Sequence, residues 1–232
     1  MAKHVAIAGV TGAVGTEMVR MLEERNFPVA SLRALASSRS VGKTVDFRGD
    51  KVRVEELKAD SFKGIDIALF SAGGPRSKEF ASAAVKAGAV VIDNSSAFRM
   101  DPKVPLVVPE VNPEAIRQHQ GIIANPNCST IIMNVPVWPL YKAFGVERIF
   151  VATYQAASGA GMTAMVELEA ETRAVLEGRE FQRTVIPFRY AFNLFPHNSS
   201  MGEDGYCEEE VKMLKETRKI FGDPAIRINA FC

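Results

Sequence analysis

The alternation of apolar strands, small-residue turns and helices along the first half of the chain restricts its fold more than any other feature. Strand-like apolar runs cover residues 4–8, 32–36, 65–70 and 89–92, and helical spacing follows the first and third of them. Strands, turns and helices repeated in this order are typical of parallel strands joined by crossover helices. We therefore expect residues 1–127 to form a doubly wound α/β domain.

The second half has a different order of elements. Its expected elements are strands over 148–155 and 225–231 and helices over 163–176 and 208–221. Residues 185–200 are rich in Pro, Phe and Asn without a clear period, so they predict a partly ordered loop. We expect residues 128–232 to form a second, α+β domain. Its last strand reaches the end of the sequence without a polar tail, which suggests a truncated chain.

Composition excludes several classes of protein. The formal net charge is +1, and no run of Lys or Arg indicates a nucleic-acid-binding surface. No apolar stretch reaches the roughly 18 residues that span a bilayer, and no signal peptide precedes the first strand. The three widely spaced cysteines argue for a reducing compartment, so we expect a cytoplasmic protein without a metal site.

Glycines at positions 9, 12 and 15 form a variant of the dinucleotide fingerprint between the first strand and the first helix. Such glycines allow a tight turn and let a pyrophosphate approach the N-terminus of the helix. A plain tight turn is the alternative. The small-residue turn at Ser71, Ala72 and Gly73 follows the third strand and offers a second close approach to a cofactor.

The residues after the second strand bear on the choice of cofactor. An NAD site usually has Asp or Glu at this position, to bind the ribose 2′-hydroxyl. This chain instead has Ser37, Arg39 and Ser40, whose hydroxyl and guanidinium groups suit a 2′-phosphate. The sequence therefore favours NADP over NAD, with a solvated polar turn as the alternative.

Cys128 follows a short apolar strand and opens an apolar segment, 131–135, with helical character. At this position the thiol meets the positive end of a helix, which stabilises a thiolate and makes it a nucleophile. An isolated cysteine can also be a small buried hydrophobic residue. The position alone leaves both interpretations open.

Six motifs, in order along the chain, resemble the aspartate-β-semialdehyde dehydrogenase family. They are Gly9-Val10-Thr11-Gly12-Ala13-Val14-Gly15, Ser71-Ala72-Gly73-Gly74, Asp93-Asn94-Ser95-Ser96-Ala97-Phe98-Arg99, Asn125-Pro126-Asn127-Cys128-Ser129-Thr130, Tyr154-Gln155-Ala156-Ala157-Ser158-Gly159-Ala160-Gly161 and Glu209-Glu210-Val211-Lys212. The cysteine motif is the most specific of them. The resemblance implies a Rossmann-type NADP-binding domain and a catalytic and dimerisation domain.

The resemblance also implies roles for individual residues. Cys128 matches the nucleophile that attacks aspartyl phosphate to form a thioacyl enzyme, which NADPH then reduces to the semialdehyde. Gln155 matches the residue that orients the acyl group, and Asn127 is expected to hold the turn. The substrate-binding residues by this resemblance are Arg99 and Lys212 for the phosphate, Glu209 for the ammonium group, and Ser158. The expected cofactor contacts are Gly9, Thr11, Gly12, Ala13, Val14, Gly15, Ser37, Arg39, Ser40, Ser71, Ala72, Gly73, Asn94, Gly159 and Gly161.

The match lacks two groups. The family's acid–base histidine and carboxylate-binding arginine follow the position of Cys232, and His4, His119 and His197 lie outside any matching motif. A polypeptide of these residues alone is therefore expected to be poorly active, since a missing acid–base group costs about 10²–10⁴-fold in rate. NADP binding is expected to survive this loss.

Two other functions remain open at this point. N-acetyl-γ-glutamyl-phosphate reductase shares the fold and the thioacyl chemistry, although it favours Gly-Cys-Tyr around the nucleophile. A non-catalytic NADP-binding protein is the other alternative. The resemblance further implies a homodimer, or a dimer of dimers, formed through the second half of the chain, while regulation and source are not indicated.

Overall fold

The computed structural model describes residues 1–232 as two compact units. The first unit comprises residues 1–127 together with Lys219–Gly222, and the second comprises the remaining residues of 128–232. The return of 219–222 to the first unit was not indicated by the sequence. Each unit is described by itself below.

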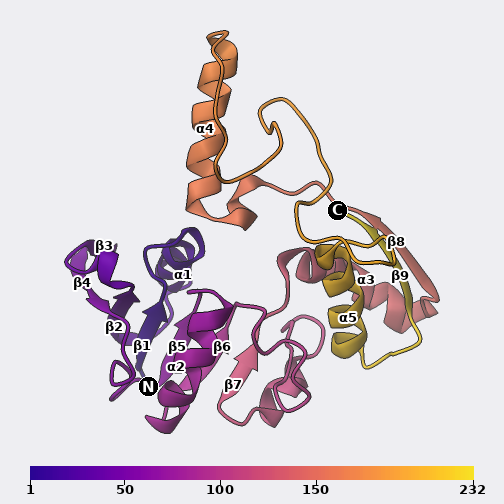
Figure 1. Ribbon diagram of the computed structural model, residues 1–232. Helices are drawn as coiled ribbons and strands as arrows, with labels where there is room; N and C mark the ends of the chain where they lie inside the picture. The colour runs from indigo at the N-terminus through magenta and orange to yellow at the C-terminus, as the bar shows by residue number, and fades with distance from the viewer. The chain divides into compact units, whose positions relative to one another are not determined.

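A seven-stranded sheet forms the centre of the first unit (Figure 1). Its strands are β1 (Lys3–Ala8), β2 (Val29–Ala36), β3 (Thr44–Phe47), β4 (Asp50–Glu56), β5 (Ile67–Phe70), β6 (Val90–Asp93) and β7 (Ile122–Ala124). They lie in the order β3-β4-β2-β1-β5-β6-β7, and every neighbouring pair is parallel except β3 with β4. This arrangement confirms the expected parallel α/β domain.

Helices α1 (Ala13–Glu24) and α2 (Gly74–Lys86) belong to different hydrophobic clusters of this sheet. Alternate residues of β1 point to opposite faces, so Val5 and Ile7 join the cluster that contains Val19 of α1. Ala6 and Ala8 join the cluster with Phe80 of α2, where the rings of Phe62 and Phe70 stack at 5.6 Å. The near-continuous apolar character of the strands follows from burial on both faces.

Two details of the first unit differ from the expectations. Strand β2 begins at Val29 rather than Leu32, and the β3–β4 hairpin was not anticipated. The hairpin turns at Arg48 and Gly49, whose φ angles are 53° and 85°. Two consecutive positive φ angles are what a tight hairpin turn requires. Its strands carry more polar than apolar residues, so they gave little hydrophobic signal.

The second unit contains three helices and a two-stranded parallel sheet. These elements are α3 (Cys128–Phe144), β8 (Arg148–Ala152), α4 (Met162–Leu176), α5 (Glu208–Phe221, whose last residues belong to the first unit) and β9 (Arg227–Phe231). Strand β9 pairs with β8 from Arg148↔Arg227 to Ala152↔Phe231. Helix α3 is longer than the expected 131–135 segment and includes two prolines. No helix in the structure is both long enough and apolar enough to cross a bilayer.

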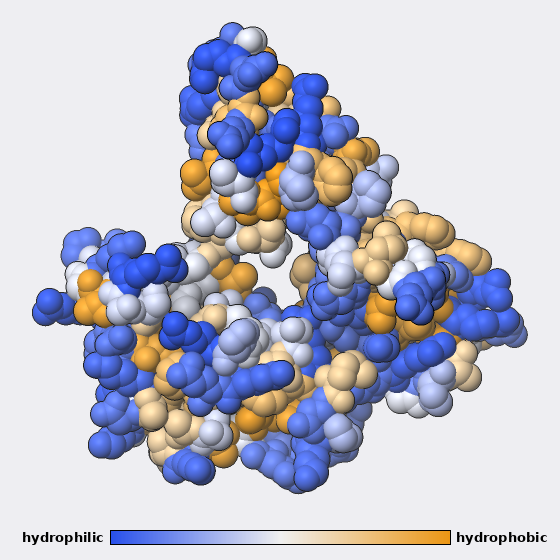
Figure 2. Space-filling view, viewed as in Figure 1, coloured by the Kyte–Doolittle hydropathy of each residue, from blue (hydrophilic) through white to orange (hydrophobic).

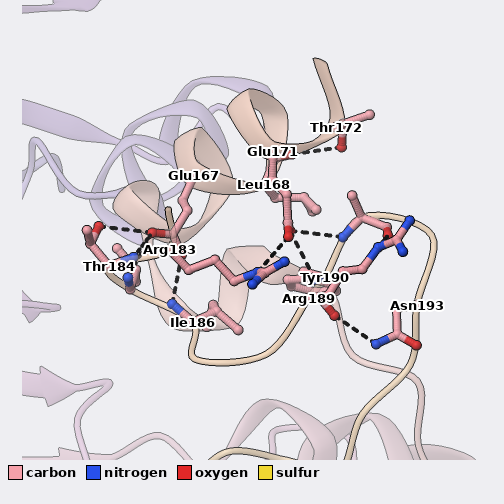
Figure 3. A network of polar contacts seen from close by, with 12 residues as sticks. Glu167, Leu168, Glu171, Thr172, Arg183, Thr184, Ile186, Arg189, Tyr190 and Asn193 are labelled. Atoms are coloured by element: carbon pink, nitrogen blue, oxygen red, sulfur yellow. Dashed lines mark hydrogen bonds and ion pairs between the residues drawn. The ribbon is translucent and has the colours of Figure 1, made fainter. Parts of the chain in front are cut away.

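The segment after α4 is irregular, as expected, but it is firmly anchored (Figure 3). The side chain of Glu167 accepts hydrogen bonds from the backbone N–H groups of Thr184, Val185 and Ile186 at 2.6–2.8 Å. One helical turn later, Glu171 accepts the backbone N–H groups of Tyr190 and Ala191, both at 3.0 Å. The two carboxylates therefore replace a neighbouring strand as hydrogen-bond partners of this segment.

Candidate functional site

The carboxyl ends of β1, β2, β5, β6 and β7 lie along one edge of the parallel sheet. The chain runs outward from β1 through β2 on one side and from β5 through β6 on the other. Such a reversal between two adjacent strands is where open α/β sheets bind ligands. The predicted cofactor residues of the first unit lie in the connections that follow these strands, including the first turn of α1 and the short 3-10 helix Ser38–Ser40.

The glycine turn after β1 is too close to its neighbours to accept side chains. Gly9 has φ +90°, and a Cβ there would lie 2.4 Å from the carbonyl oxygen of Ser71. A Cβ at Gly15 would lie 2.1 Å from the carbonyl oxygen of Gly9. No side chain caps the N-terminus of α1 at Gly12. The first N–H groups of this helix, from Ala13 and Val14 onward, are therefore available to an anion.

The residues after β2 meet the glycine turn. The hydroxyl groups of Thr11 and Ser40 lie 3.3 Å apart, so the two loops form one continuous surface. Ser37 precedes the short 3-10 helix Ser38–Ser40, and the guanidinium-bearing Arg39 at its centre is exposed. These hydroxyl groups and the cation fit a phosphate on the ribose of a dinucleotide.

The loop after β5 lies at the same edge of the sheet as the glycine turn. The N–H of Ser71 donates to the carbonyl of Ala8, and Ala72 and Gly73 lead into α2, with φ +86° at Gly73. Of the predicted cofactor residues, Gly159 and Gly161 belong to the second unit. Three features of the first unit thus fit a dinucleotide. The glycine turn allows close approach to the backbone, the N-terminus of α1 is uncapped, and hydroxyl groups lie where the ribose 2′-phosphate is expected.

A buried polar network follows β6. Asp93 is fully buried and accepts hydrogen bonds from the hydroxyl groups of Ser77 and Ser95. The side chain of Asn94 accepts one from the amide of Asn125 at 2.7 Å. Arg99, only 8% exposed, donates to the carbonyl oxygens of Asn94 and Asn125 at 3.1 and 3.0 Å. The network joins the loop after β6 to the turn after β7.

Lys219 holds the segment that follows Arg99, a role that the sequence did not indicate. Its ammonium group donates to the carbonyl oxygens of Arg99, Asp101 and Val104 at 2.7–2.8 Å. Partial burial lowers the pKa of Lys219, although the nearby Asp101 opposes this shift. Helix α5 thereby contributes its last turn to the first unit. Only the contact, and no sequence motif, identifies this lysine.

Cys128 is the first residue of α3 and its side chain is exposed. Three residues, Asn125 to Asn127, separate this helix from the end of β7. Asn127 is buried at this junction, as are Ser129 and Thr130 within the first turn of the helix. The thiol is therefore accessible, whereas the turn around it is enclosed. The alternative of a buried hydrophobic cysteine does not apply to Cys128.

Gln155 lies just beyond the end of β8. Its side-chain amide donates to the hydroxyl of Thr153 at 3.3 Å, and its backbone carbonyl accepts the hydroxyl of Tyr190 at 2.9 Å. Ser158 is exposed within the 3-10 helix Ala157–Ala160 that leads into α4. Tyr190 was not singled out from the sequence, because it lies in the segment without a period.

The structure brings Glu209 and Lys212 together on the first turns of α5. The carboxylate of Glu209 is buried, and its Oε2 lies 3.6 Å from the ammonium group of Lys212. Glu208 lies 3.2 Å from the same ammonium group and is more exposed. Two acidic groups thus share one half-buried cation.

The predicted residues fall into two sets. The first unit contains Arg99, Asn127 and most of the cofactor residues, and the second contains Cys128, Gln155, Ser158, Glu209 and Lys212. The side chains of the three histidines have these partners: His4 contacts Ser31, His119 accepts the N–H of Gly121, and His197 contacts Ser199. None of these contacts involves a predicted catalytic residue.

Comparison with known proteins matches both halves of the chain. Residues 4–119 match the family model described as semialdehyde dehydrogenase, NAD binding domain, and residues 137–232 match the semialdehyde dehydrogenase dimerisation domain. The aspartate-semialdehyde dehydrogenase of Synechocystis is 57% identical over 99% of this chain and 68% of its own length. That of Aquifex aeolicus is 55% identical over 100% of this chain and 69% of its own length.

Solved structures agree with these matches. Aspartate semialdehyde dehydrogenase II from Vibrio cholerae, in complex with ASA, is 49% identical with a TM-score of 0.98. That likeness covers 100% of this chain and 70% of the other. Identity at this level over both halves of the chain shows common descent with a single family. The chain therefore belongs to the aspartate-semialdehyde dehydrogenase family.

Proposed function

We propose that this chain reduces L-aspartyl 4-phosphate to L-aspartate 4-semialdehyde with NADPH, through a thioacyl intermediate on Cys128, and releases phosphate. The observation that carries the proposal is the exposed thiol at the first residue of α3, which only three residues separate from a strand of the parallel sheet. Exposure lets a substrate reach the sulfur, and the first N–H groups of a helix can stabilise an oxyanion that forms beside it.

The chemistry needs few groups from the protein. The Cys128 sulfur attacks the carbonyl carbon of the acyl phosphate, the C–O bond to the phosphate breaks, and a thioester forms. NADPH, when bound, would supply the hydride that reduces this thioester; the C–S bond would then break, with the Cys128 thiolate as leaving group and the semialdehyde as product. The side-chain amide of Gln155 orients the acyl group, and backbone N–H groups of the first turn of α3 stabilise the oxyanion.

Arg99 and Lys212 bind the phosphate group in this proposal, and Glu209 binds the substrate ammonium group. Two cations suit a dianionic phosphoryl group, and the fixed guanidinium of Arg99 is pre-organised by its backbone partners. Asn127 holds the turn before the nucleophile, and Ser158 contributes a hydroxyl group near Gln155.

NADP is the proposed cofactor. Residues 4–119 match an NAD binding domain, and the acidic residue that would favour NAD is replaced by Ser37, Arg39 and Ser40. The backbone around Gly9, Gly12 and Gly15 receives the pyrophosphate, with Thr11, Ser71 and Asn94 along its path. Gly159 and Gly161 complete the cofactor contacts from the second unit.

A homodimer, or a tetramer built from dimers, is the proposed assembly. Residues 137–232 match a dimerisation domain. Apolar side chains are exposed among polar ones on α4 and the segment after it (Figure 2). The most exposed of them are Leu176, Phe192 and Leu194, followed by Met201 and Val166. Burial of these side chains against a second copy would remove apolar surface from water.

The reaction places the protein in the biosynthesis of lysine, threonine, methionine and diaminopimelate. A cytoplasmic location agrees with such a role.

Mass spectrometry of the Cys128 peptide tests the proposal even when turnover is slow. Protein mixed with aspartyl phosphate should gain an aspartyl adduct on this peptide, and NADPH should remove it with release of semialdehyde. Cys128→Ser should abolish the adduct, whereas Cys232→Ser should retain it, because Cys232 is only partly exposed and has no proposed role in the reaction.

Acetylglutamyl phosphate is the comparison substrate for the alternative reductase. Acylation by this compound in preference to aspartyl phosphate would contradict the proposal. Tight NADPH binding without any acylation of Cys128 would instead support a non-catalytic NADP-binding protein.

A further inference from the structure

Tyr190 makes a contact that the reaction described above does not use. Its hydroxyl group donates to the backbone carbonyl of Gln155 at 2.9 Å, across 35 positions of sequence. The partner is the residue proposed to orient the acyl group. Because the carbonyl belongs to the peptide between Gln155 and Ala156, the hydrogen bond restricts rotation of that peptide plane.

Tyr190 is itself held in place from several directions (Figure 3). Its N–H donates to Oε2 of Glu171, which also accepts the next N–H, from Ala191. The other oxygen of Glu171 lies 2.6 Å from Nε of Arg183. The tyrosine ring meets Phe195 edge to face at 5.1 Å. The hydroxyl group therefore sits at the end of a rigid support rather than on a mobile loop.

Gln155 has few other restraints in the second unit. Its side-chain amide makes a 3.3 Å hydrogen bond to Thr153, two residues earlier on the same segment. Thr153 is fixed to β9, because its N–H and hydroxyl donate to the carbonyl of Phe231 at 2.9 and 3.4 Å, but this leaves the peptide after Gln155 unrestrained. The Tyr190 hydrogen bond restrains that peptide, because it connects the backbone of Gln155 to the loop anchored on α4.

We propose that Tyr190 is a positioning residue for Gln155, and that Glu171 supports it. The carboxylate of Glu171 holds the Tyr190 backbone, and the Tyr190 hydroxyl holds the Gln155 peptide plane. A shift of about 1 Å in an orienting group can cost a large factor in rate. The inference rests on the proposed role of Gln155 and extends it to the α4 loop.

A double-mutant cycle tests the inference under single-turnover conditions, with protein in excess over aspartyl phosphate. Tyr190→Phe removes only the hydroxyl and keeps the ring contact with Phe195. It should slow acylation of Cys128 about five- to tenfold, the value of one lost hydrogen bond. Gln155→Ala should slow acylation about 10²-fold, as for other lost orienting groups.

The double variant should be no slower than Gln155→Ala alone, because Tyr190 acts only through Gln155. A purely structural role would instead multiply the two effects. NADPH affinity should be unchanged in all three variants. Asn193→Ala is the matched control: it removes a hydrogen bond to the carbonyl of Arg189 in the same loop and should leave the rate unchanged.

The outcomes separate this inference from the proposed function. If Gln155→Ala is slow but Tyr190→Phe matches the unmodified protein, the inference is wrong and the proposed function stands. If the rate loss of the double variant equals the product of the two single losses, the inference is likewise wrong and the proposed function stands. If Gln155→Ala acylates at the normal rate, the proposed role of Gln155 fails and the inference fails with it.

Discussion

The sheet of the first unit and the loop after α4 solve the same problem in opposite ways. Both must provide partners for backbone N–H groups that are removed from water. In the sheet, each strand between β4 and β7 finds its partners on neighbouring strands, and apolar side chains fill both faces. In the loop, two glutamates of one helix accept five N–H groups.

The difference shows how the two regions depend on single residues. Many apolar contacts contribute to the stability of the sheet. A buried side chain there can be replaced by another apolar side chain of similar volume, whereas its truncation is costly. The loop depends on two carboxylates, each of which satisfies several backbone groups. Loss of one carboxylate should therefore release a short segment and leave the rest of the molecule unchanged.

The largest expected effect is in the sheet. Phe70→Ala removes a fully buried ring that stacks on Phe62, and should destabilise the first unit by about 3–5 kcal/mol. Hydrogen exchange should accelerate throughout β1, β5 and β6. The fluorescence of Trp138, the single tryptophan, is the control: it reports on α3 of the second unit and should not change. A loss confined to the residues around Phe70 would contradict the shared stability of the sheet.

Glu167→Ala should have a smaller and more local effect. It leaves the N–H groups of 184–186 without their carboxylate acceptor, at a cost of about 2 kcal/mol in local opening. Hydrogen exchange of these amides should be about thirtyfold faster, whereas the exchange rates of the β1 amides should not change. Glu169→Ala is the matched control on the same helix, since its exposed ion pair with Arg173 contributes little. Equal effects of the two variants would refute the anchoring role.

Lys219→Met tests whether a loop of the first unit also depends on a single charged side chain. This position resembles the α4 loop, because one charged side chain holds three backbone groups. Its loss should cost about 1–2 kcal/mol and accelerate exchange of residues 101–104, without loosening β5. Lys215→Met, an exposed lysine on the same helix, should be neutral. Loosening of the whole sheet would show that the lysine does more than hold this loop.

The smallest effect at neutral pH concerns titration of the loop. Burial raises the pKa of Glu167, but the N–H groups of Ile186, Thr184 and Val185 outweigh it and lower the pKa from 4.5 to about 2. Because the folded pKa lies below the unfolded one, the stabilisation is complete above about pH 4.5 and decreases toward pH 2. The protection factor of the Ile186 amide should decrease over the same pH range. In Glu167→Gln this pH dependence should be absent. Loss of protection between pH 7 and 5 would contradict the assignment.

The sequence predicted those parts of the molecule that have a regular pattern. The parallel strands, the glycine turn and α5 all follow from apolar periodicity and small residues at fixed spacing. The β3–β4 hairpin escaped prediction because its strands are largely polar. Lys219 and Tyr190 escaped because each acts on a segment far away along the chain, and such contacts have no local signature.

Glu167 and Glu171 show the limit most clearly. Two glutamates spaced by four on a helix ordinarily indicate a solvated face. Here both are buried, because a segment without secondary structure folds over them and supplies N–H donors. The same spacing is compatible with both situations, so only the path of the later residues distinguishes them.

The sequence by itself determined the sheet of the first unit, the small-residue turns at its edge and the family to which the motifs belong. These features depend on residues close together along the chain, where sterics and apolar periodicity act directly. The tertiary structure alone decided which buried charges hold which loops. Those partners are distant in sequence, and a buried charge is stable only where folding brings donors or acceptors to it.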